Sequence, residues 1–103
     1  MNILIIDTSS SEEVKVGLKI NGKEYFITST TNKLKSQAVL PLIDKILRKH
    51  KLIIKDIASI QVNRGPGSFT GLKVGVVIAN TLSLVLQIPV NGKKVGELEV
   101  PDY

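Results

Sequence analysis

The amino-acid sequence predicts an α/β fold, with a mixed five-stranded sheet and two main helices in a single domain. The chain has 103 residues, which is enough for one hydrophobic core but not for two. Hydrophobic residues make up 43% of the chain and aromatic residues 4%, so Ile, Leu and Val must fill that core. The apolar period also changes along the chain, from the alternation typical of strands to the longer period typical of helices.

Three strands are expected before the first helix. Residues 2–7 form an apolar run that ends in Asp7, which is typical of a central strand. Residues 14–20 alternate between apolar and other side chains, which is typical of a strand with one buried face. Asn21-Gly22 follows. Because both residues tolerate positive φ angles, we expect a tight hairpin turn that returns the chain as a strand over residues 24–30.

A helix is expected from Ser36 to about residue 50. Its apolar residues fall on one helical stripe: Val39, Leu42, Ile43, Ile46 and Leu47. Pro41 should lie in the first turn, where its missing N–H does no harm. Residues 57–63 are the next apolar run and are expected to form the fourth strand.

A glycine-rich turn follows this strand and leads into a second helix over residues 72–86. Ser68 or Thr70 can cap the first free N–H groups of that helix. Small residues recur every four positions within it, and this smooth stripe predicts close packing on the sheet: Gly71, Gly75 and Ala79.

The end of the chain is expected to add a short fifth strand over Ile88–Val90, since a proline is acceptable at the start of a strand. Residues 91–103 are charged and contain a second Asn-Gly pair. We expect them to form a small edge strand or a tail.

Composition excludes some classes of function. The chain contains no cysteine, which excludes disulfides, thiolate metal sites and cysteine nucleophiles. The apolar runs at residues 2–7 and 72–86 do not resemble a signal peptide, and neither reaches the ~20 residues that a membrane span needs. We therefore expect a cytoplasmic protein without a membrane partner. The formal charge of +5 favours acidic partners without specifying one.

Specific motifs connect the chain to a known family. The string Gly65-Pro66-Gly67-Ser68-Phe69-Thr70-Gly71-Leu72-Lys73-Val74-Gly75 resembles the signature of the TsaB (YeaZ) family. Further matches are Ile6-Asp7-Thr8-Ser9, residues 40–44 and Ile88-Pro89-Val90. The resemblance covers residues 1–90. It implies a ribonuclease H-like, actin-like (ASKHA) domain truncated to the N-terminal half of the family, with residues 91–103 divergent.

The resemblance also implies a function. TsaB proteins are non-catalytic partners of the transferase TsaD, which transfers threonylcarbamoyl to the adenosine beside the tRNA anticodon. The implied partners are a TsaD-like paralogue, a TsaE-like ATPase or a second copy of the chain, with tRNA reached through the complex. The implied contact face lies on the two helices and includes Leu42, Ile46, Leu72, Gly75, Val76 and Ala79.

Two polar segments are candidate binding sites. Gly65 to Gly71 could hold a phosphate or carboxylate at a helix N-terminus, but we favour a structural turn in which Phe69 plugs the core or a partner. Asp7, Thr8 and Ser9 lie where related ATPases bind metal and phosphate. A lone carboxylate at such a position more often anchors a turn. We therefore expect no cofactor, with ATP and Mg²⁺ at a partner interface as a weaker alternative.

Two enzymatic or ligand-binding alternatives remain open from the sequence. A small ribonuclease H-like nuclease would use Asp7 as one ligand of a metal pair, although such sites need several carboxylates. A nucleotide-binding regulatory module would use Asp7 to Ser9 with the glycine-rich turn. The single histidine, His50, leaves no paired-histidine metal motif.

Overall fold

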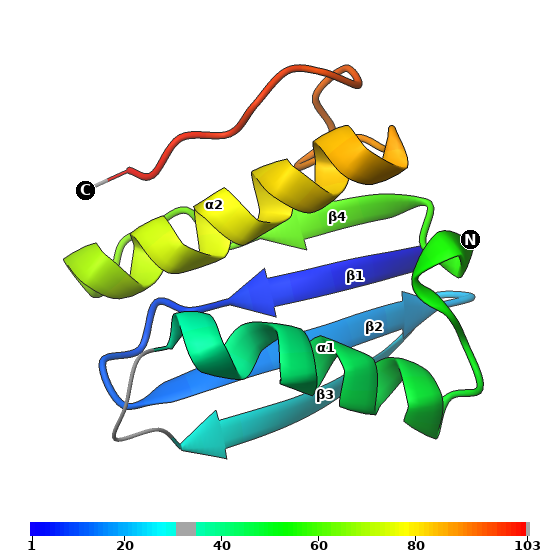
Figure 1. The fold of residues 1–103 in the computed structure, drawn as a ribbon, viewed down its shortest axis with the longest axis horizontal. Helices are drawn as coiled ribbons and strands as arrows, with labels where there is room; N and C mark the ends of the chain where they lie inside the picture. Colours follow the sequence, from blue (N-terminus) through cyan, green and yellow to red (C-terminus); the bar gives the residue numbers. More distant parts are fainter. Residues whose placement is uncertain (31–34, 103) are drawn as a thin grey trace.

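A four-stranded mixed sheet carries both long helices on one of its faces (Figure 1). The computed structural model describes residues 1–30 and 35–102. Its elements in chain order are β1 (Asn2–Asp7), β2 (Glu13–Ile20), β3 (Lys23–Thr30), α1 (Ser36–Lys49), a short 3₁₀ helix (Ile54–Asp56), β4 (Ser59–Val62) and α2 (Phe69–Leu86). The expected strands and helices up to residue 86 are therefore confirmed, with shifts at their ends.

The sheet has the order β3-β2-β1-β4. β2 pairs antiparallel with both β1 and β3, whereas β4 pairs parallel with β1. The hairpin between β2 and β3 turns at Asn21 and Gly22, which have φ angles of 51° and 84°. These left-handed conformations are those that an Asn-Gly hairpin turn requires, so the predicted turn is confirmed.

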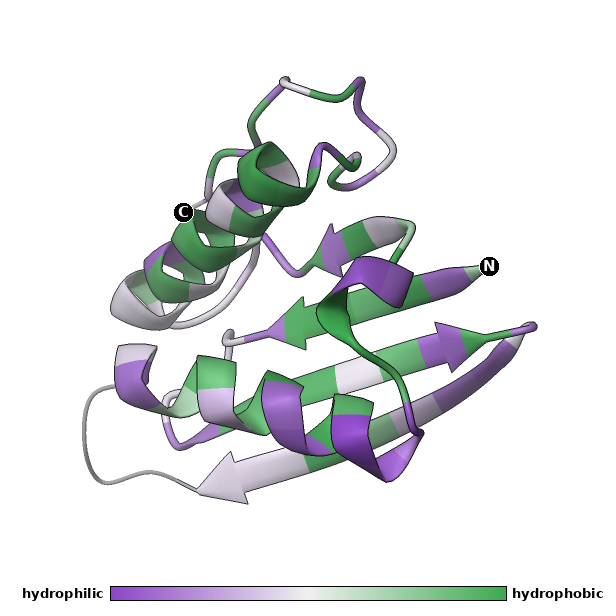
Figure 2. Cartoon of the chain, turned by 45° about the vertical axis from the view of Figure 1, so that its right-hand side comes forward, coloured by the Kyte–Doolittle hydropathy of each residue, from purple (hydrophilic) through white to green (hydrophobic). Residues whose placement is uncertain are grey.

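The core lies between the sheet and the two helices. Alternate residues of β1 and β2 point towards the helices and are fully buried: Leu4, Ile6, Val14, Val16 and Leu18. The stripe predicted on α1 faces them and is buried as well. Figure 2 shows α2 hydrophobic along most of its length and α1 alternating between hydrophobic and hydrophilic residues. The predicted aliphatic core is therefore confirmed.

The expected fifth strand is wrong. Val90 makes only an isolated parallel bridge to Ile60, because Asn91 turns the chain away at once with a φ of 51°. The position predicted for Pro41 is also wrong. α1 begins at Ser36, so Pro41 falls in its second turn, beyond the N-terminal turn where a missing N–H has no helical partner.

Residues 91–102 form no strand, so of the two expected forms the tail is found. Its anchor is Glu99, whose side chain is 4% exposed and lies 3.5 Å from Arg64 and 3.7 Å from Lys93. Burial opposes ionisation of this carboxyl. Hydrogen bonds from Asn91 and the Val100 N–H, together with the two cations, outweigh burial and hold its pKa below the usual range.

This lowered pKa predicts an acid-sensitive contribution to stability. Ionised Glu99 stabilises the fold above its ordinary pKa of about 4.3, and that contribution disappears as the pH falls through the lower pKa of the folded state. We expect Glu99→Gln to be less stable than the natural chain at neutral pH, with the difference shrinking towards about pH 3. Urea unfolding at a series of pH values measures it. A difference that stays constant across the series would contradict this assignment.

Candidate functional site

The glycine-rich turn packs backbone to backbone on the loop that follows β1. The Ser68 N–H donates to the Ser9 carbonyl at 2.8 Å. A Cβ atom on Gly67 would lie 2.6 Å from the Ser9 Cβ, closer than side chains tolerate. Gly65 has a φ of 139°, which non-glycine residues rarely adopt. The glycines at these positions are therefore required by close approach and by backbone conformation.

Thr8 connects the end of β1 to the first turns of α2. Its hydroxyl donates to the Gly71 carbonyl at 2.5 Å and accepts from the Gly75 N–H at 3.1 Å. These two backbone groups are an i and i+4 pair of the helix. Thr8 is fully buried, and a Cβ on Gly71 or Gly75 would collide with it. The predicted close packing of the small-residue stripe is therefore confirmed.

Three N–H groups of the turn, those of Gly65, Ser68 and Gly71, are engaged within the chain. The Gly65 N–H donates to the Asn63 side chain at 3.0 Å, and the Gly71 N–H donates to the Ser68 hydroxyl at 3.3 Å. Ser68 is thus the N-cap of α2, and it is one of the two residues predicted for that position. The Ser68 N–H donates to the Ser9 carbonyl. These three contacts favour a structural turn over an anion-binding loop.

Asp7 anchors the same loop. Its Oδ1 atom accepts from the Ser9 N–H at 3.0 Å, from the Ser9 hydroxyl at 2.6 Å and from the Asn63 side chain at 3.2 Å. Burial opposes ionisation, but these hydrogen bonds and the charge of Lys15 outweigh it, so the pKa of Asp7 lies below its usual range. The geometry favours the turn-anchor interpretation of Asp7, Thr8 and Ser9. Within residues 1–30 and 35–102, no group of three His, Asp or Glu side chains could hold a metal ion.

A small polar pocket, which the sequence did not indicate, lies beside this junction. It has a volume of about 230 Å³ and is lined by Ser11, Lys35, Ser36, Ser68, Thr70, Gly71 and Val74. The Lys35 ammonium donates to the Thr8 carbonyl at 3.2 Å. Burial lowers the pKa of Lys35, and the nearby charge of Asp7 partly offsets that effect. One cation and several hydroxyls suit a small anion, but the Lys35 charge is already directed at the protein.

The six residues predicted to contact a partner are all buried in the chain itself: Leu42, Ile46, Leu72, Gly75, Val76 and Ala79. This part of the sequence prediction is corrected, because apolar periodicity finds the side of a helix that packs on the sheet before it finds any outer surface. Phe69 does not plug the core, since it is 63% exposed, and its expected contact with a partner stays a prediction.

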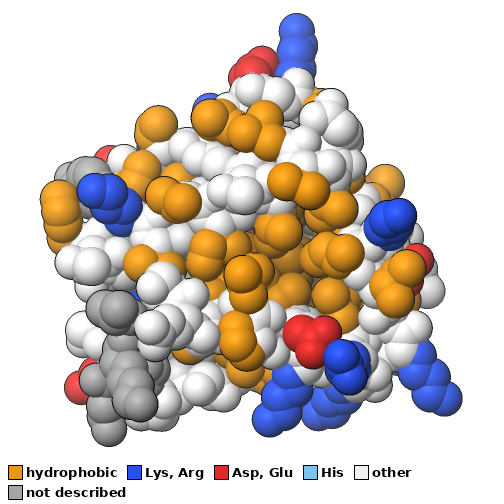
Figure 3. Space-filling model, in the orientation of Figure 1, with side chains coloured by type: hydrophobic (Ala, Val, Ile, Leu, Met, Phe, Trp, Pro, Cys, Tyr) orange, Lys and Arg blue, Asp and Glu red, His pale blue; other side chains and the backbone are white. Residues whose placement is uncertain are grey.

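An apolar groove between α1 and α2 is the surface that those helices do present. It consists of two hollows of about 440 and 240 Å³. We call it the helix groove and define it by its apolar lining residues, with the charged side chains of Asp44, Arg48 and Lys73 also among its walls: Leu40, Ile43, Leu47, Ile53, Val74, Val77, Ile78 and Leu82. Figure 3 shows hydrophobic side chains gathered across this face. Leu40, Val77 and Ile53 are 53%, 55% and 63% exposed, so apolar surface is left in water.

α2 contributes to the groove because it is apolar on most of its circumference. Its mean hydropathy is 1.7 over 18 residues, and by length and composition alone it could cross a membrane, yet only 33% of that window is buried inside the chain. A core helix passes the same test. The sheet covers one side of α2, and a helix that is apolar all round needs cover on the other sides too.

Comparisons with known proteins agree on one group of relatives. A family model described as "TsaD: tRNA N6-adenosine threonylcarbamoyltransferase" matches residues 26–94. The tRNA threonylcarbamoyladenosine biosynthesis protein TsaB of Buchnera aphidicola subsp. Schizaphis graminum is 36% identical over 90 residues, which cover 87% of this chain and 42% of that protein. TsaB of Escherichia coli is 35% identical over 92 residues, which cover 89% and 39%.

The solved structure titled "YeaZ from Pseudomonas aeruginosa" superposes with a TM-score of 0.80 at 28% identity, covering 90% of this chain and 43% of that one. The chain thus spans about two fifths of the length of the relatives it matches. The expected ribonuclease H-like, actin-like fold class is confirmed, with four strands in place of five.

The Thr8 junction predicts a reversed effect of a glycine substitution. In an exposed helix, alanine in place of glycine stabilises by about 1 kcal/mol. Gly75→Ala should instead destabilise the fold by about 1–3 kcal/mol, because the new methyl group overpacks against the Thr8 hydroxyl. Chemical unfolding measures the change.

A double-mutant cycle tests whether the cause is Thr8. Thr8→Ala makes room at the junction, so Gly75→Ala should cost less in that background, with a coupling of about 0.5 kcal/mol or more. Thr81 on the exposed side of α2 is the control, and Thr81→Ala should leave the effect of Gly75→Ala unchanged. A stabilising Gly75→Ala would refute the close approach.

Proposed function

The chain belongs to the TsaB (YeaZ) family, and on this premise we propose that it is a non-catalytic partner in tRNA threonylcarbamoyladenosine biosynthesis. Its role is to support a TsaD-like transferase by docking through the helix groove. The tRNA is contacted through the complex, and the transfer reaction takes place on the partner.

The observation that carries this proposal is the uncovered helix groove. Leu40 and Val77 lie on different helices and leave about half of their surfaces in water. Apolar surface gains free energy in proportion to the area removed from water, and contiguous patches of this kind typically mark interaction sites. A partner that inserts apolar side chains between α1 and α2 would fill both hollows at once.

The choice of partner follows from the relatives. The matching family model is that of the transferase itself, and the tRNA N6-adenosine threonylcarbamoyltransferase of Cryptococcus neoformans (strain JEC21) is 35% identical over 79 residues of this chain. The proposed partner therefore carries a segment that resembles this one. Two such helix pairs can meet about a pseudo-twofold axis, in the way that identical surfaces meet in symmetric dimers. A homodimer would use the same groove and would compete with the transferase for it. A TsaE-like ATPase would bind elsewhere on the complex.

The junction supports a role without chemistry on this chain. Asp7 is held by Ser9 and Asn63, and the backbone of α2 occupies the space beside Thr8. A nuclease needs carboxylates that converge on a metal pair, and a nucleotide site needs backbone N–H groups left for phosphate. Neither alternative gains an observation that favours it.

Charged substitutions in the groove test the proposal. Val77→Asp and Leu40→Asp should each weaken binding to the TsaD-like transferase of the same source by more than about tenfold, because an unpaired carboxylate would be buried at the contact. Both positions are half exposed in the free chain, so the fold should be retained. Calorimetric titration with the purified transferase measures the affinity.

The matched control is Val85→Asp, which places the same charge on α2 outside the groove, at a residue that is 73% exposed. Binding should change little in this variant. If all three variants bind as the natural chain does, the groove is not the contact. If the natural chain does not bind the transferase at all, the proposed function is wrong.

A further inference from the structure

The C-terminal end of α1 carries a group of cations that lies apart from the helix groove. Lys45, Lys49 and Lys51 are all exposed, and Figure 3 shows Lys and Arg side chains gathered at the border of the face where α1 ends. Lys45 and Lys49 are four residues apart, so they lie on the same side of the helix. Leu40 and Leu47 line the groove, and the helical period places them on the opposite side of α1.

The charges of these lysines are not paired within the chain. Asp44 is the acidic residue of this part of α1, and its carboxylate lies 2.9 Å from Arg48. Both of those side chains border the groove. Within residues 1–30 and 35–102, no ion pair includes Lys45, Lys49 or Lys51. Their ammonium groups therefore remain available to an acidic partner.

The end of the helix is closed by backbone groups. The Leu52 N–H donates to the Leu47 carbonyl at 2.9 Å, and the Lys51 N–H donates to the Arg48 carbonyl at 3.1 Å. These are the bonds of a Schellman motif, so lysine side chains are not needed to cap these carbonyls. Lys51 has a φ of 57°, at a position where glycine is usual. Conformation thus disfavours lysine there, and what the position gains is its charge, which acts on the helix dipole or on a partner.

The fold brings an aromatic pair to the same end of α1, although its members are far apart in the sequence. Tyr25 of β3 packs on His50, with ring centroids 4.6 Å apart and ring planes tilted by 53°. The His50 Nδ1 atom donates to the Ile46 carbonyl at 2.9 Å, which fixes the imidazole on the helix. Tyr25 is still 39% exposed, so part of its ring is open to a further stacking partner.

We propose that this basic end of α1, defined by Tyr25, Lys45, Lys49, His50 and Lys51, binds an unpaired loop of RNA. Lysine side chains neutralise phosphates, and aromatic rings stack with unpaired bases. An acidic protein would use the same cations but has no bases to place on Tyr25. The net charge of +5 draws a polyanion to the chain over longer distances.

This inference rests on the proposed function, in which the complex acts on tRNA, and adds a direct contact between tRNA and this chain. The anticodon of a tRNA lies in a single-stranded loop, which is the kind of RNA that aromatic side chains recognise. The basic end and the helix groove lie on opposite sides of α1. The chain can therefore hold tRNA and the transferase at the same time.

Removal of charge tests the phosphate contacts. Lys45→Gln combined with Lys49→Gln should weaken binding of an unmodified tRNA transcript by about tenfold. The slope of log affinity against log salt concentration should fall by about 1 to 2, because two phosphate contacts are lost. Fluorescence anisotropy with labelled transcript measures both quantities, on the chain alone and on its complex with the TsaD-like transferase.

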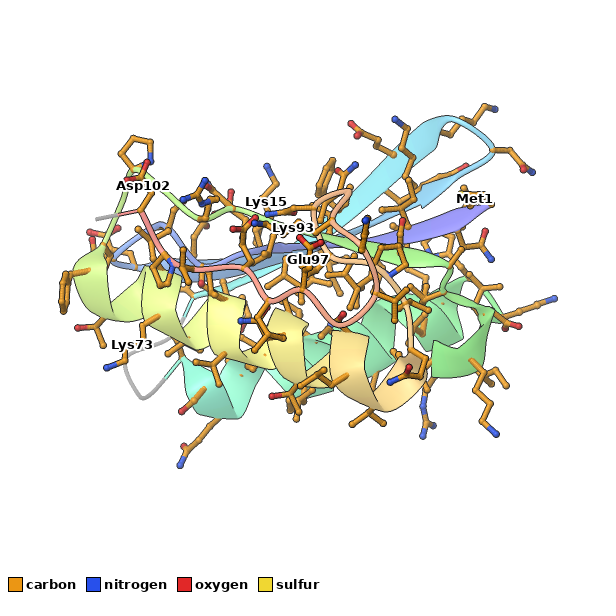
Figure 4. All side chains as sticks on the ribbon, turned by 90° about the horizontal axis from the view of Figure 1, so that it is seen from above. Met1, Lys15, Lys73, Lys93, Glu97 and Asp102 are labelled. Carbon is orange, nitrogen blue, oxygen red and sulfur yellow. The ribbon has the colours of Figure 1, made fainter. Side chains whose placement is uncertain are left out.

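The matched control is Lys19→Gln combined with Lys94→Gln, which removes the same charge elsewhere. Lys19 lies on the face of the sheet away from the helices, where Figure 4 shows Lys15 of the same strand, and Lys94 lies in the exposed tail. This pair should change tRNA affinity much less. Equal losses in the two pairs would show that only net charge matters and would overturn the inference.

Substitution of Tyr25 tests the stacking contact. Tyr25→Leu should weaken tRNA binding by about fivefold or more and leave the salt slope unchanged, whereas Tyr25→Phe keeps a ring and should bind as the natural chain does. If Tyr25→Leu also binds as the natural chain does, no base stacks there and the proposed RNA contact is overturned. Polyglutamate is the competitor for the alternative occupant. Displacement of tRNA by polyglutamate at equal charge concentration would indicate an acidic protein instead of RNA.

Titration with the transferase separates this inference from the proposed function. Affinity for the transferase should be unchanged in the lysine and Tyr25 variants, because these residues lie outside the groove. Unchanged tRNA binding in the Lys45 and Lys49 double variant would overturn the inference and leave the proposed function intact. A natural chain that does not bind the transferase would contradict the proposed function, and the measurements on the chain alone would still decide whether the basic end binds RNA.

Discussion

The fold depends on the close approach of α2 to the end of β1 at Thr8. The Thr8 hydroxyl satisfies the Gly71 carbonyl and the Gly75 N–H at a point where the two backbones nearly touch. Only glycine leaves the room for this contact at positions 71 and 75, whereas Gly67 is required by its packing on Ser9 and Gly65 by its φ of 139°. The same contact places the backbone of α2 against the carboxyl end of β1, where α/β proteins usually hold ligands, and leaves the small pocket beside Lys35.

This junction also determines which surface remains for function. With its glycine side pressed on the sheet, α2 must turn Val77 and Val85 outward, and the groove towards α1 stays open. α2 therefore carries more apolar side chains than the core buries. A helix of this composition is understandable if a second protein supplies the missing cover, as we propose.

Local patterns predicted most of the fold because they act over short distances. The Asn21-Gly22 turn and the alternation in β2 fix the hairpin, and the period of α1 fixes its buried face. The path of the tail could not be predicted, because it depends on contacts between Asn80 and Glu99, which are 19 residues apart. Such polar contacts leave no periodic signal.

The sequence predicted only part of the candidate site, again because local patterns can be recognised in a sequence and packing between distant segments cannot. The glycine string located the junction, and a turn-anchoring Asp7 was the favoured interpretation. The contact residues were misplaced because apolar residues on a helix are divided between core and surface only by the actual packing, and here Val76 is buried while Val77 is exposed. Lys35 carries no pattern that would place it beside Thr8, so the polar pocket also went unpredicted.

The most direct test of this account is a map of amide chemical-shift changes in the isotope-labelled chain on addition of the TsaD-like transferase. The account predicts that the largest changes lie on the residues of α1 and α2 that border the groove, with Asp7 to Ser9 and the tail little affected. Changes centred on the glycine-rich turn and Asp7 would contradict it, since they would place the working surface of the protein at the junction that we describe as structural.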